Sequence, residues 1–309
     1  MANITIRDLT FDGNRSQQTD PYSSYLDELL IQSTKSVLVT NCNFINSPAH
    51  SFVVLGGGAS GIVINNSFFQ NSTLFAFITN PPAQVLTGNA LYQICSTLTL
   101  PDDILIANSR FDNSGEGIFN DATNLRVVNN VFNNNHSYPV PYNDDGGQFD
   151  LDACTDNAAI VGNVFQNGSA ASTGHHVAGI EVHAANVSLV NNTVRNNQQD
   201  GIDLLGVEGV FVANWDPATS VTGNGGAGIQ IFHVLPLSPA EARPNDSIII
   251  DSAIVTSNGA WGLLTQSPDT PITHLVVTNS CLSGNRLGPM KLNNVTSDAL
   301  IQNNLNSGC

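Results

Sequence analysis

The sequence predicts an all-β protein whose 309 residues form a single-stranded right-handed parallel β-helix, a solenoid of about eleven coils. The main observation is a repeated phrase. A short apolar run leads into Asn, one or two small residues, a bulky apolar residue, and then Asn or Gly. Clear copies occupy 106–111, 128–132, 161–165 and 277–282. The shortest spacings, about 21 to 25 residues, give the length of a bare coil, and longer spacings indicate insertions.

The second observation is that the repeat has the composition of strands. Segments such as 3–7, 247–251 and 274–278 are rich in β-branched residues that alternate or form short apolar runs. No window shows a sustained helical stripe. Leucine-rich repeats have a similar period, but the spaced leucines and the helix of each turn are missing. The repeat unit therefore consists of strands and corners.

Asn and Phe in the phrase have separate expected roles. Asn is expected at the corners, because it tolerates left-handed backbone geometry and can bond within its own turn. Stacked Asn side chains can also form amide ladders along the solenoid. The bulky residue, with Phe68 taken as one example, is expected to point inward. Phe111, Phe132 and Phe165 should then form part of an internal stack.

Residues 3–14 (NITIRDLTFDGN) resemble an early coil of the pectate-lyase-like superfamily, and the later repeats are similar to its generic β-helix repeat. The resemblance covers almost the whole chain and implies the fold more than the activity, because the superfamily includes lyases, hydrolases, epimerases, tailspikes and adhesins. The Gly-His-Gly and Arg-Ile-Lys elements of polygalacturonases are absent, as is the Asp-Pro-His motif of alginate epimerases. We expect one domain over 1–309, and the sequence leaves open whether an upstream N-terminal segment has been removed.

The composition favours a secreted or cell-surface protein, extracellular or periplasmic. Only 11% of the residues are charged, and 25 acidic against nine basic residues give a formal charge of −16. This charge disfavours nucleic acid and anionic membranes as partners. No apolar run approaches the roughly 20 residues that span a bilayer. The sequence leaves the oligomeric state open.

The five cysteines include no close metal-type pair. Cys281 and Cys309 are about one coil apart, so a disulfide between them is a candidate. Cys42 and Cys154 are expected to be core or stacking residues. The odd number leaves at least one free thiol.

Insertions indicate where a trough could form over one sheet. Three of them precede the same strand, and two follow it. The first group is 15–27, 136–146 and 168–178, and the second is 81–101 and 234–245. In stacked coils the two groups would wall opposite edges of that sheet. The alternative is surface decoration without a ligand.

Aligning the strands that floor this trough predicts two outward columns of side chains. The first column is Phe119, Asp150, Glu181, Asp203 and Gln230. The second column is Asp121, Asp152, His183, Leu205 and Phe232. The aligned strands place five ionisable groups on three consecutive rungs. The predicted catalytic residues are Asp150, Asp152, Glu181, His183 and Asp203.

Stacked carboxylates destabilise a sheet, so their presence suggests that they have a role. Two of them about 5 Å apart repel by roughly 0.8 kcal/mol in water and about 3 kcal/mol at an effective dielectric of 20. Such a cluster raises the pKa of some members, which is how general acids arise. An acid and a carboxylate are what glycoside hydrolysis requires. The alternatives are a calcium site and plain solvated surface.

The sequence therefore predicts a carbohydrate-active enzyme, most simply a glycoside hydrolase that acts on a polysaccharide or oligosaccharide and requires no cofactor. Substrate contacts are assigned to Trp261, Gln230, Phe232 and Tyr142, since aromatic faces suit sugar rings. One alternative is a polysaccharide lyase in which calcium supplies the cation, because the predicted floor has no Lys or Arg. The other is a non-catalytic glycan-binding tailspike or adhesin.

Overall fold

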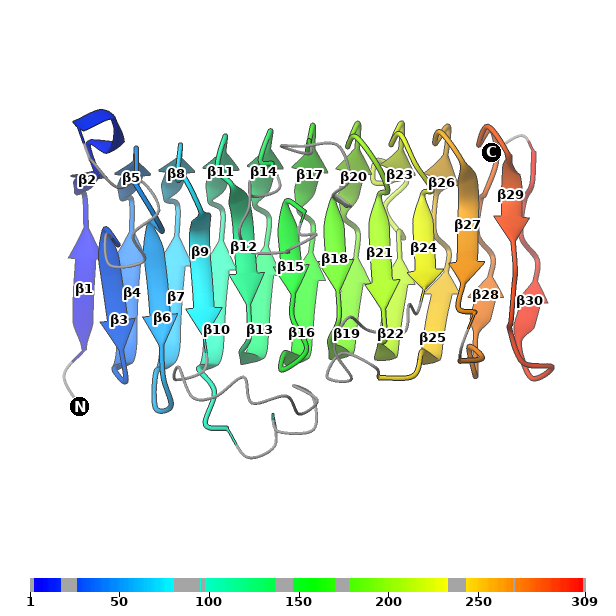
Figure 1. Cartoon of the computed structure of the whole chain (residues 1–309), viewed down its shortest axis with the longest axis horizontal. Coiled ribbons are helices and arrows are strands. Elements are labelled where there is room, and N and C mark those ends of the chain that lie inside the picture. Colours follow the sequence, from blue (N-terminus) through cyan, green and yellow to red (C-terminus); the bar gives the residue numbers. More distant parts are fainter. Residues whose placement is uncertain are drawn as a thin grey trace.

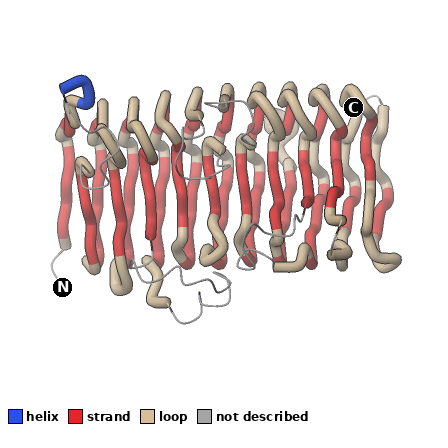
Figure 2. The backbone as a smooth tube through the Cα atoms, in the orientation of Figure 1, coloured by secondary structure: helices blue, strands red, loops and turns tan. Residues whose placement is uncertain are grey.

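The chain forms a long parallel β-helix, whose coils each run through up to three sheets that extend along the molecule (Figure 1). This computed structural model describes residues 3–17, 27–80, 95, 98–136, 147–169, 178–232, 243–268 and 270–307. Strands dominate it throughout, and one short 3-10 helix, η1 (Arg15–Gln17), lies near the N-terminus (Figure 2). The predicted fold class is confirmed, and the eleven strands of the largest sheet fit the expected number of coils.

Sheet A is the eleven-stranded sheet. In spatial order it contains β1 (Ile4–Arg7), β4 (Lys35–Thr40), β7 (Ser60–Asn65), β10 (Asp102–Ala107), β13 (Thr123–Val128), β16 (Asp156–Val161), β19 (Ala185–Val190), β22 (Glu208–Ala213), β25 (Asp246–Asp251), β28 (Val276–Thr278) and β30 (Leu300–Gln302).

Sheet B is built from short strands. It contains β2 (Thr10–Asp12), β5 (Asn43–Ile45), β8 (Phe68–Gln70), β11 (Arg110–Asp112), β14 (Val131–Asn133), β17 (Val164–Gln166), β20 (Thr193–Arg195), β23 (Val221–Thr222) and β26 (Val255–Thr256).

Sheet C is the sheet for which the trough was predicted. It contains β3 (Leu29–Gln32), β6 (Phe52–Leu55), β9 (Phe75–Asn80), β12 (Glu116–Asn120), β15 (Phe149–Leu151), β18 (Ile180–Val182), β21 (Ile202–Leu205), β24 (Ile229–Phe232), β27 (Trp261–Gln266) and β29 (Gly288–Lys291).

The core is a stack of equivalent side chains, one from each rung. Six Phe rings lie almost parallel, with neighbouring centroids 4.6 to 4.8 Å apart: Phe11, Phe44, Phe69, Phe111, Phe132 and Phe165. The predicted inward position of the last three is confirmed. Phe68 was the wrong marker, because Phe69 pairs with Phe111 while Phe68 pairs with Arg110.

Asn controls the corners in the two ways expected. Corner residues such as Asn108 and Asn129 have φ values of 50° and 55°, which Asn tolerates better than most residues. Other Asn side chains lie inside the corner and donate to the next rung. Asn197, Asn224 and Asn258 continue such a ladder, with Nδ2 to Oδ1 distances of 2.9 and 3.0 Å. These bonds satisfy amide groups that are removed from water.

The cysteines differ in part from expectation. Cys42 is buried and free, as predicted. Cys154 is not a simple core residue, because it forms a disulfide with Cys95, which lies 59 residues earlier in the chain. Cys281 is disulfide-bonded, while its predicted partner Cys309 lies outside the described residues. Sequence spacing had suggested only neighbouring coils, whereas Cys95 belongs to an insertion.

The Phe stack gives a test of the register. Phe132→Ala should lower the free energy of unfolding by about 3 to 5 kcal/mol, because it leaves a cavity between two rings. Chemical denaturation measures this change. Phe211→Ala is the matched control, since Phe211 is only half-buried and lies on the outer face of sheet A. Equal losses in the two variants would contradict the stack.

Candidate functional site

The acidic residues of sheet C lie in the predicted column. Asp150 pairs in register with Glu181, and Glu181 pairs with Asp203. The column continues to Phe119 on one side and to Gln230 on the other. The strands β12, β15, β18, β21 and β24 stand side by side in Figure 1. A regular ladder therefore brings together carboxylates that are 22 to 53 residues apart in sequence.

These side chains are more buried than an open trough would allow. Asp150, Glu181 and Asp203 are only 2%, 4% and 1% exposed. Apolar residues of the same column, Val53 and Ile78, are also buried although they point outward. The three acids therefore lie in the predicted column but do not face open solvent. Burial strengthens the mutual repulsion of charged acids in one column.

Asp152 and His183 lie at the more accessible end of the cluster, just beyond β15 and β18. Each remains partly exposed. His183 Nε2 lies 2.8 Å from Glu181 Oε1, and only 5% of the Glu181 side chain is exposed. The second oxygen, Glu181 Oε2, is buried and has no hydrogen-bond partner among the described residues. The pair thus couples a carboxylate to a partly accessible imidazole.

Asp121 and Asp152 form a carboxyl pair that sequence reasoning did not assign to the site. Asp121 appeared in the second predicted column but was not counted among the catalytic residues. Burial and repulsion from Asp152 raise the pKa of Asp121 well above its ordinary value. Burial also raises the pKa of Asp152, while the charge of His183 opposes this shift. The interaction between the two carboxyls raises the pKa of Asp121 and lowers that of Asp152, so it favours the proton on Asp121.

The turn after β15 fixes this pair. Thr155 N donates to Asp152 O at 2.8 Å, which closes a β-turn. Cys154 N donates to Asp121 Oδ1 at 3.0 Å, and Ala153 N donates to Asp152 Oδ1 at 2.7 Å. The side chain of Thr155 is buried and donates to Asn120 O at 2.5 Å. Backbone N–H groups thus hold both carboxyls.

Arg243 brings a cation to the edge of the site, although the predicted floor strands contain no Lys or Arg. It belongs to the 234–245 insertion, and its Nη2 donates to Ala153 O at 3.1 Å. The contact joins residues 90 positions apart and places the guanidinium beside the turn that follows Asp152. Arg243 lies in a loop that has no periodic pattern, so the alignment of strands could not predict its position.

The predicted substrate contacts are dispersed. Gln230 is buried next to Asp203 in the first column. Phe232 is half-buried at the end of β24 and pairs with Leu205. Trp261 is half-buried at the start of β27, where it pairs with Gly288. Tyr142 lies outside the described residues, as do most of the insertions expected to wall a trough.

A raised pKa alone does not mark this site. Burial also raises the pKa of Glu28 to about 8 near the N-terminal end of sheet C, where Glu28 Oε1 accepts a hydrogen bond from Gly13 N at 2.8 Å. That carboxyl lacks the cluster of acids around Asp150. Within the described residues, no three His, Cys, Asp or Glu side chains are arranged to hold a metal ion. The described part of the cluster therefore offers no ready ligand set for calcium.

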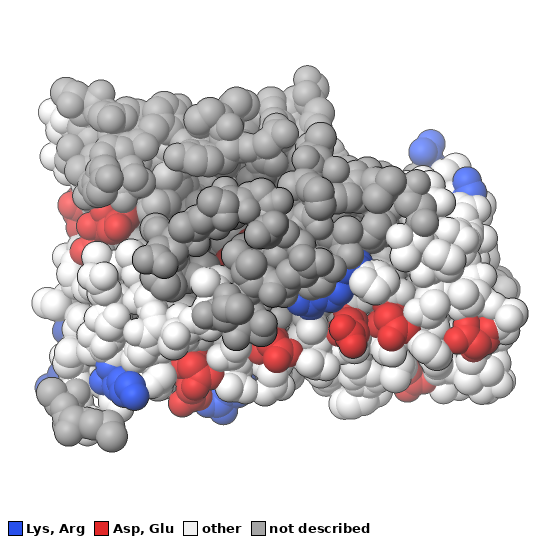
Figure 3. All heavy atoms as spheres, turned by 60° about the horizontal axis from the view of Figure 1, so that its bottom comes forward, with Lys and Arg blue, Asp and Glu red and all other residues white. Residues whose placement is uncertain are grey.

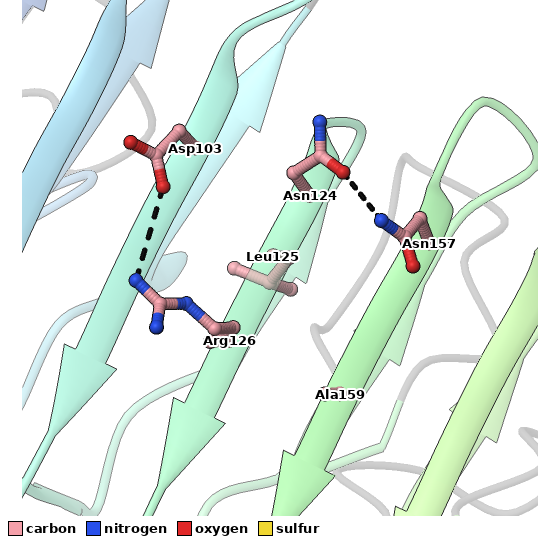
Figure 4. Close-up of a pocket in the computed structure, with 6 residues that line it drawn as sticks. All are labelled: Asp103, Asn124, Leu125, Arg126, Asn157 and Ala159. Atoms are coloured by element: carbon pink, nitrogen blue, oxygen red, sulfur yellow. Dashed lines mark hydrogen bonds and ion pairs between the residues drawn. The ribbon is translucent and has the colours of Figure 1, made fainter.

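The outer surface differs from the cluster. A shallow hollow on sheet A is lined by Asp103, Asn124, Leu125, Arg126, Asn157 and Ala159 (Figure 4). Its Asp103–Arg126 ion pair, 3.8 Å long, has both side chains more than half exposed. On the face shown in Figure 3, the visible acidic side chains lie in small separate groups. Neither place has the buried acids of the sheet C cluster.

A family model described as a right handed beta helix region matches residues 2–176, which is more than half of the chain. The chain belongs to the right-handed β-helix family. The match also supports the resemblance to the pectate-lyase-like superfamily. A search of curated proteins found no significant match. No helix of the described residues is long and apolar enough to cross a membrane.

Several solved structures share the fold of this β-helix protein. The A-module of the mannuronan C-5 epimerase AlgE6 from Azotobacter vinelandii has a TM-score of 0.59 at 12% identity, covering 99% of this chain and 74% of that one. A mutant of the periplasmic alginate epimerase AlgG has a TM-score of 0.58 at 13% identity, with coverages of 89% and 70%. At these identities the likeness concerns the fold alone.

The carboxyl pair gives the β-helix protein a testable pH dependence. The folded pKa of Asp121 lies above the unfolded value of about 3.9, so ionisation makes the folded state progressively less stable as the pH rises between the two values. Asp121→Asn keeps an acceptor for Cys154 N and removes the charge. Its thermal midpoint should exceed that of the unmodified protein at pH 8, and the difference should shrink toward pH 4.

Asp103→Asn provides the control, because Asp103 is exposed and lies on sheet A. Its effect should not grow between pH 5 and pH 8. A constant effect of Asp121→Asn over the same range would contradict the raised pKa of Asp121.

Proposed function

We propose that this β-helix protein is a carbohydrate-active enzyme, specifically a glycoside hydrolase that cleaves a polysaccharide or oligosaccharide. The observation that carries the proposal is a buried carboxyl pair with raised pKa values, Asp121–Asp152, beside the Glu181–His183 pair. Hydrolysis of a glycosidic bond needs a carboxylic acid to protonate the leaving oxygen and a carboxylate to activate water or attack the sugar. Environments that push two carboxyls apart in pKa supply both states at one pH.

The roles follow from exposure and from the causes of the pKa shifts. Asp152 is partly exposed, and burial together with repulsion from Glu181 raises its pKa, so it is the proposed general acid. Glu181 is the proposed base, and His183 holds its carboxylate in position at 2.8 Å. Asp150 and Asp203 flank Glu181 in the column and add negative potential, which suits the oxocarbenium-like transition state.

The backbone register favours inversion of the anomeric centre. Asp152 is two residues beyond the partner of Glu181, on the neighbouring strand. A rung of about 4.8 Å and two residues of about 3.3 Å each give a diagonal of about 8 Å. Inverting hydrolases separate their carboxyls by about 6.5 to 9.5 Å, while retaining ones use about 5 to 5.5 Å. The product anomer, read by nuclear magnetic resonance, tests this assignment.

The disulfides support export of the protein. Cys95–Cys154 and the bonded Cys281 fit an oxidising compartment, such as the periplasm or the cell exterior. Polysaccharide substrates occur in the same compartments. The proposed localisation is therefore secreted or surface-exposed.

A second candidate is a lyase or epimerase of acidic sugars, favoured by Arg243. Removal of the proton next to a uronate carboxylate needs a base and a cation that neutralises that carboxylate. Arg243 lies at the turn after Asp152, and Glu181 with His183 could supply the base. The structurally similar AlgE6 module and AlgG are named as epimerases of mannuronan and alginate. This chain lacks the Asp-Pro-His motif of alginate epimerases.

A screen of neutral and uronate polysaccharides separates the candidates. Hydrolysis produces reducing ends without absorbance of an unsaturated uronate, whereas a lyase produces both. Epimerisation changes the uronate composition without cleavage. Binding without any product would indicate a glycan-binding protein and contradict the enzyme proposal. Addition of a chelator tests the calcium-dependent form of the lyase.

Neutral variants test the catalytic roles. Asp152→Asn and Glu181→Gln should each reduce kcat on the substrate found by at least about 10² to 10⁴-fold, because each removes a proton-transfer group. Circular dichroism should show an intact fold, and Asp103→Asn should keep full activity. Full activity in the combined Asp152→Asn and Glu181→Gln variant would rule out this pair.

Arg243→Gln tests the choice between substrate classes. For a neutral glycan the variant should change KM and kcat by less than about tenfold. For a uronate it should lower kcat/KM by about 10- to 150-fold, since a charged hydrogen bond contributes roughly 1.5 to 3 kcal/mol. Arg243→Lys should recover part of the loss only if the positive charge is what matters.

A further inference from the structure

The Cys95–Cys154 disulfide is attached to the turn that holds the carboxyl pair. Cys154 is 3% exposed, and its backbone N donates to Asp121 Oδ1 at 3.0 Å. The residue before it, Ala153, donates to Asp152 and accepts from Arg243. The disulfide therefore fixes the chain at a residue that touches one member of the pair directly.

The turn is longer than its neighbours in the solenoid. The register pairs Asn120 with Leu151 and Leu151 with Val182. On sheet A, which follows sheet C along the chain, the register pairs Thr123 with Asp156 and Asp156 with Ala185. The chain thus crosses from sheet C to sheet A through four residues, 152–155, in this coil. The coils before and after cross through only two residues each, 121–122 and 183–184.

The two extra residues include the half-cystine. A longer turn has more backbone freedom, and ordering it has an entropic cost. The β-turn bond of Thr155 and the contact of Thr155 with Asn120 fix its far end. Cys154 at its middle is held by the covalent bond to an insertion of another coil.

We propose that the Cys95–Cys154 disulfide positions the Asp121–Asp152 pair, so that the candidate site works only in the oxidised protein. This inference rests on the proposed function for its catalytic consequence, but not for its structural one. Cys95 is partly exposed, so small reductants can reach the bond. A dithiol reductant would transfer two electrons and two protons to it, giving two cysteine thiols and the cyclic disulfide of the reductant.

Loss of the bond has a specific expected effect. Once freed, residues 153–154 sample other conformations, and the Cys154 N–H no longer holds Asp121. Water then reaches the pair, and both carboxyls ionise more easily. A disulfide that only stabilised the whole fold would leave this local coupling unchanged.

The structural test needs no substrate. The double variant Cys95→Ser/Cys154→Ser is compared with the unmodified protein, each with and without Asp121→Asn, by thermal unfolding between pH 4 and pH 8. We expect the pH-dependent increase in midpoint caused by Asp121→Asn to disappear in the double variant. It should persist in Cys281→Ser, which removes the disulfide of Cys281. An increase that survives in the double variant would overturn the proposal.

The kinetic test uses the substrate identified by the screen. Treatment of Cys281→Ser with dithiothreitol should lower kcat at least tenfold with little change in KM, and reoxidation should restore it. If the double variant does not fold, the dithiothreitol-treated protein replaces it in both tests. Unchanged kcat after verified reduction of the bond would reject the catalytic role. Should the screen find no substrate, the proposed function fails, while the midpoint comparison still decides the positioning role.

Discussion

The backbone hydrogen-bond ladder between successive coils is the interaction on which the rest of this structure depends. It fixes each strand one rung from the equivalent strand of the next coil, with residues paired one to one. The side chains then have no freedom to choose neighbours along the axis. Phe stacks on Phe at 4.6 to 4.8 Å, Asn bonds to Asn, and acid lies against acid. A favourable pairing is propagated along the solenoid, and so is an unfavourable one.

The acidic column shows the unfavourable case. Parallel register forces Asp150, Glu181 and Asp203 into one row, and burial removes the water that would screen them. The protein compensates locally. The pKa of Asp121 is raised, His183 contacts Glu181, and backbone N–H groups bond Asp121 and Asp152. A local loss of stability of this kind is common at active sites, where stability is traded for function.

Departures from the regular coil surround the candidate site. The corners with Asn at positive φ repeat with little change and give the body its rigidity. The exceptions are the four-residue turn 152–155, the half-cystine Cys95 and the cation Arg243. All three meet at one end of β15. The repeated coils provide the stable fold, while the connections between strands can vary and carry functional residues.

The sequence alone determined the fold, the inward Phe residues and the acidic columns, because each follows from periodicity, and a periodic pattern is repeated often enough to be read. It also determined which strands carry Asp150, Glu181 and Asp203. It failed where position depends on a single contact between distant segments. Arg243 reaches a turn 90 residues earlier, and Cys95 bonds a residue 59 positions later. Neither contact recurs in other coils, so no periodic pattern predicts it. Burial of the acids and the raised pKa of Asp121 were likewise decided by tertiary structure, since pKa depends on the surroundings of a group and not on its place in a pattern.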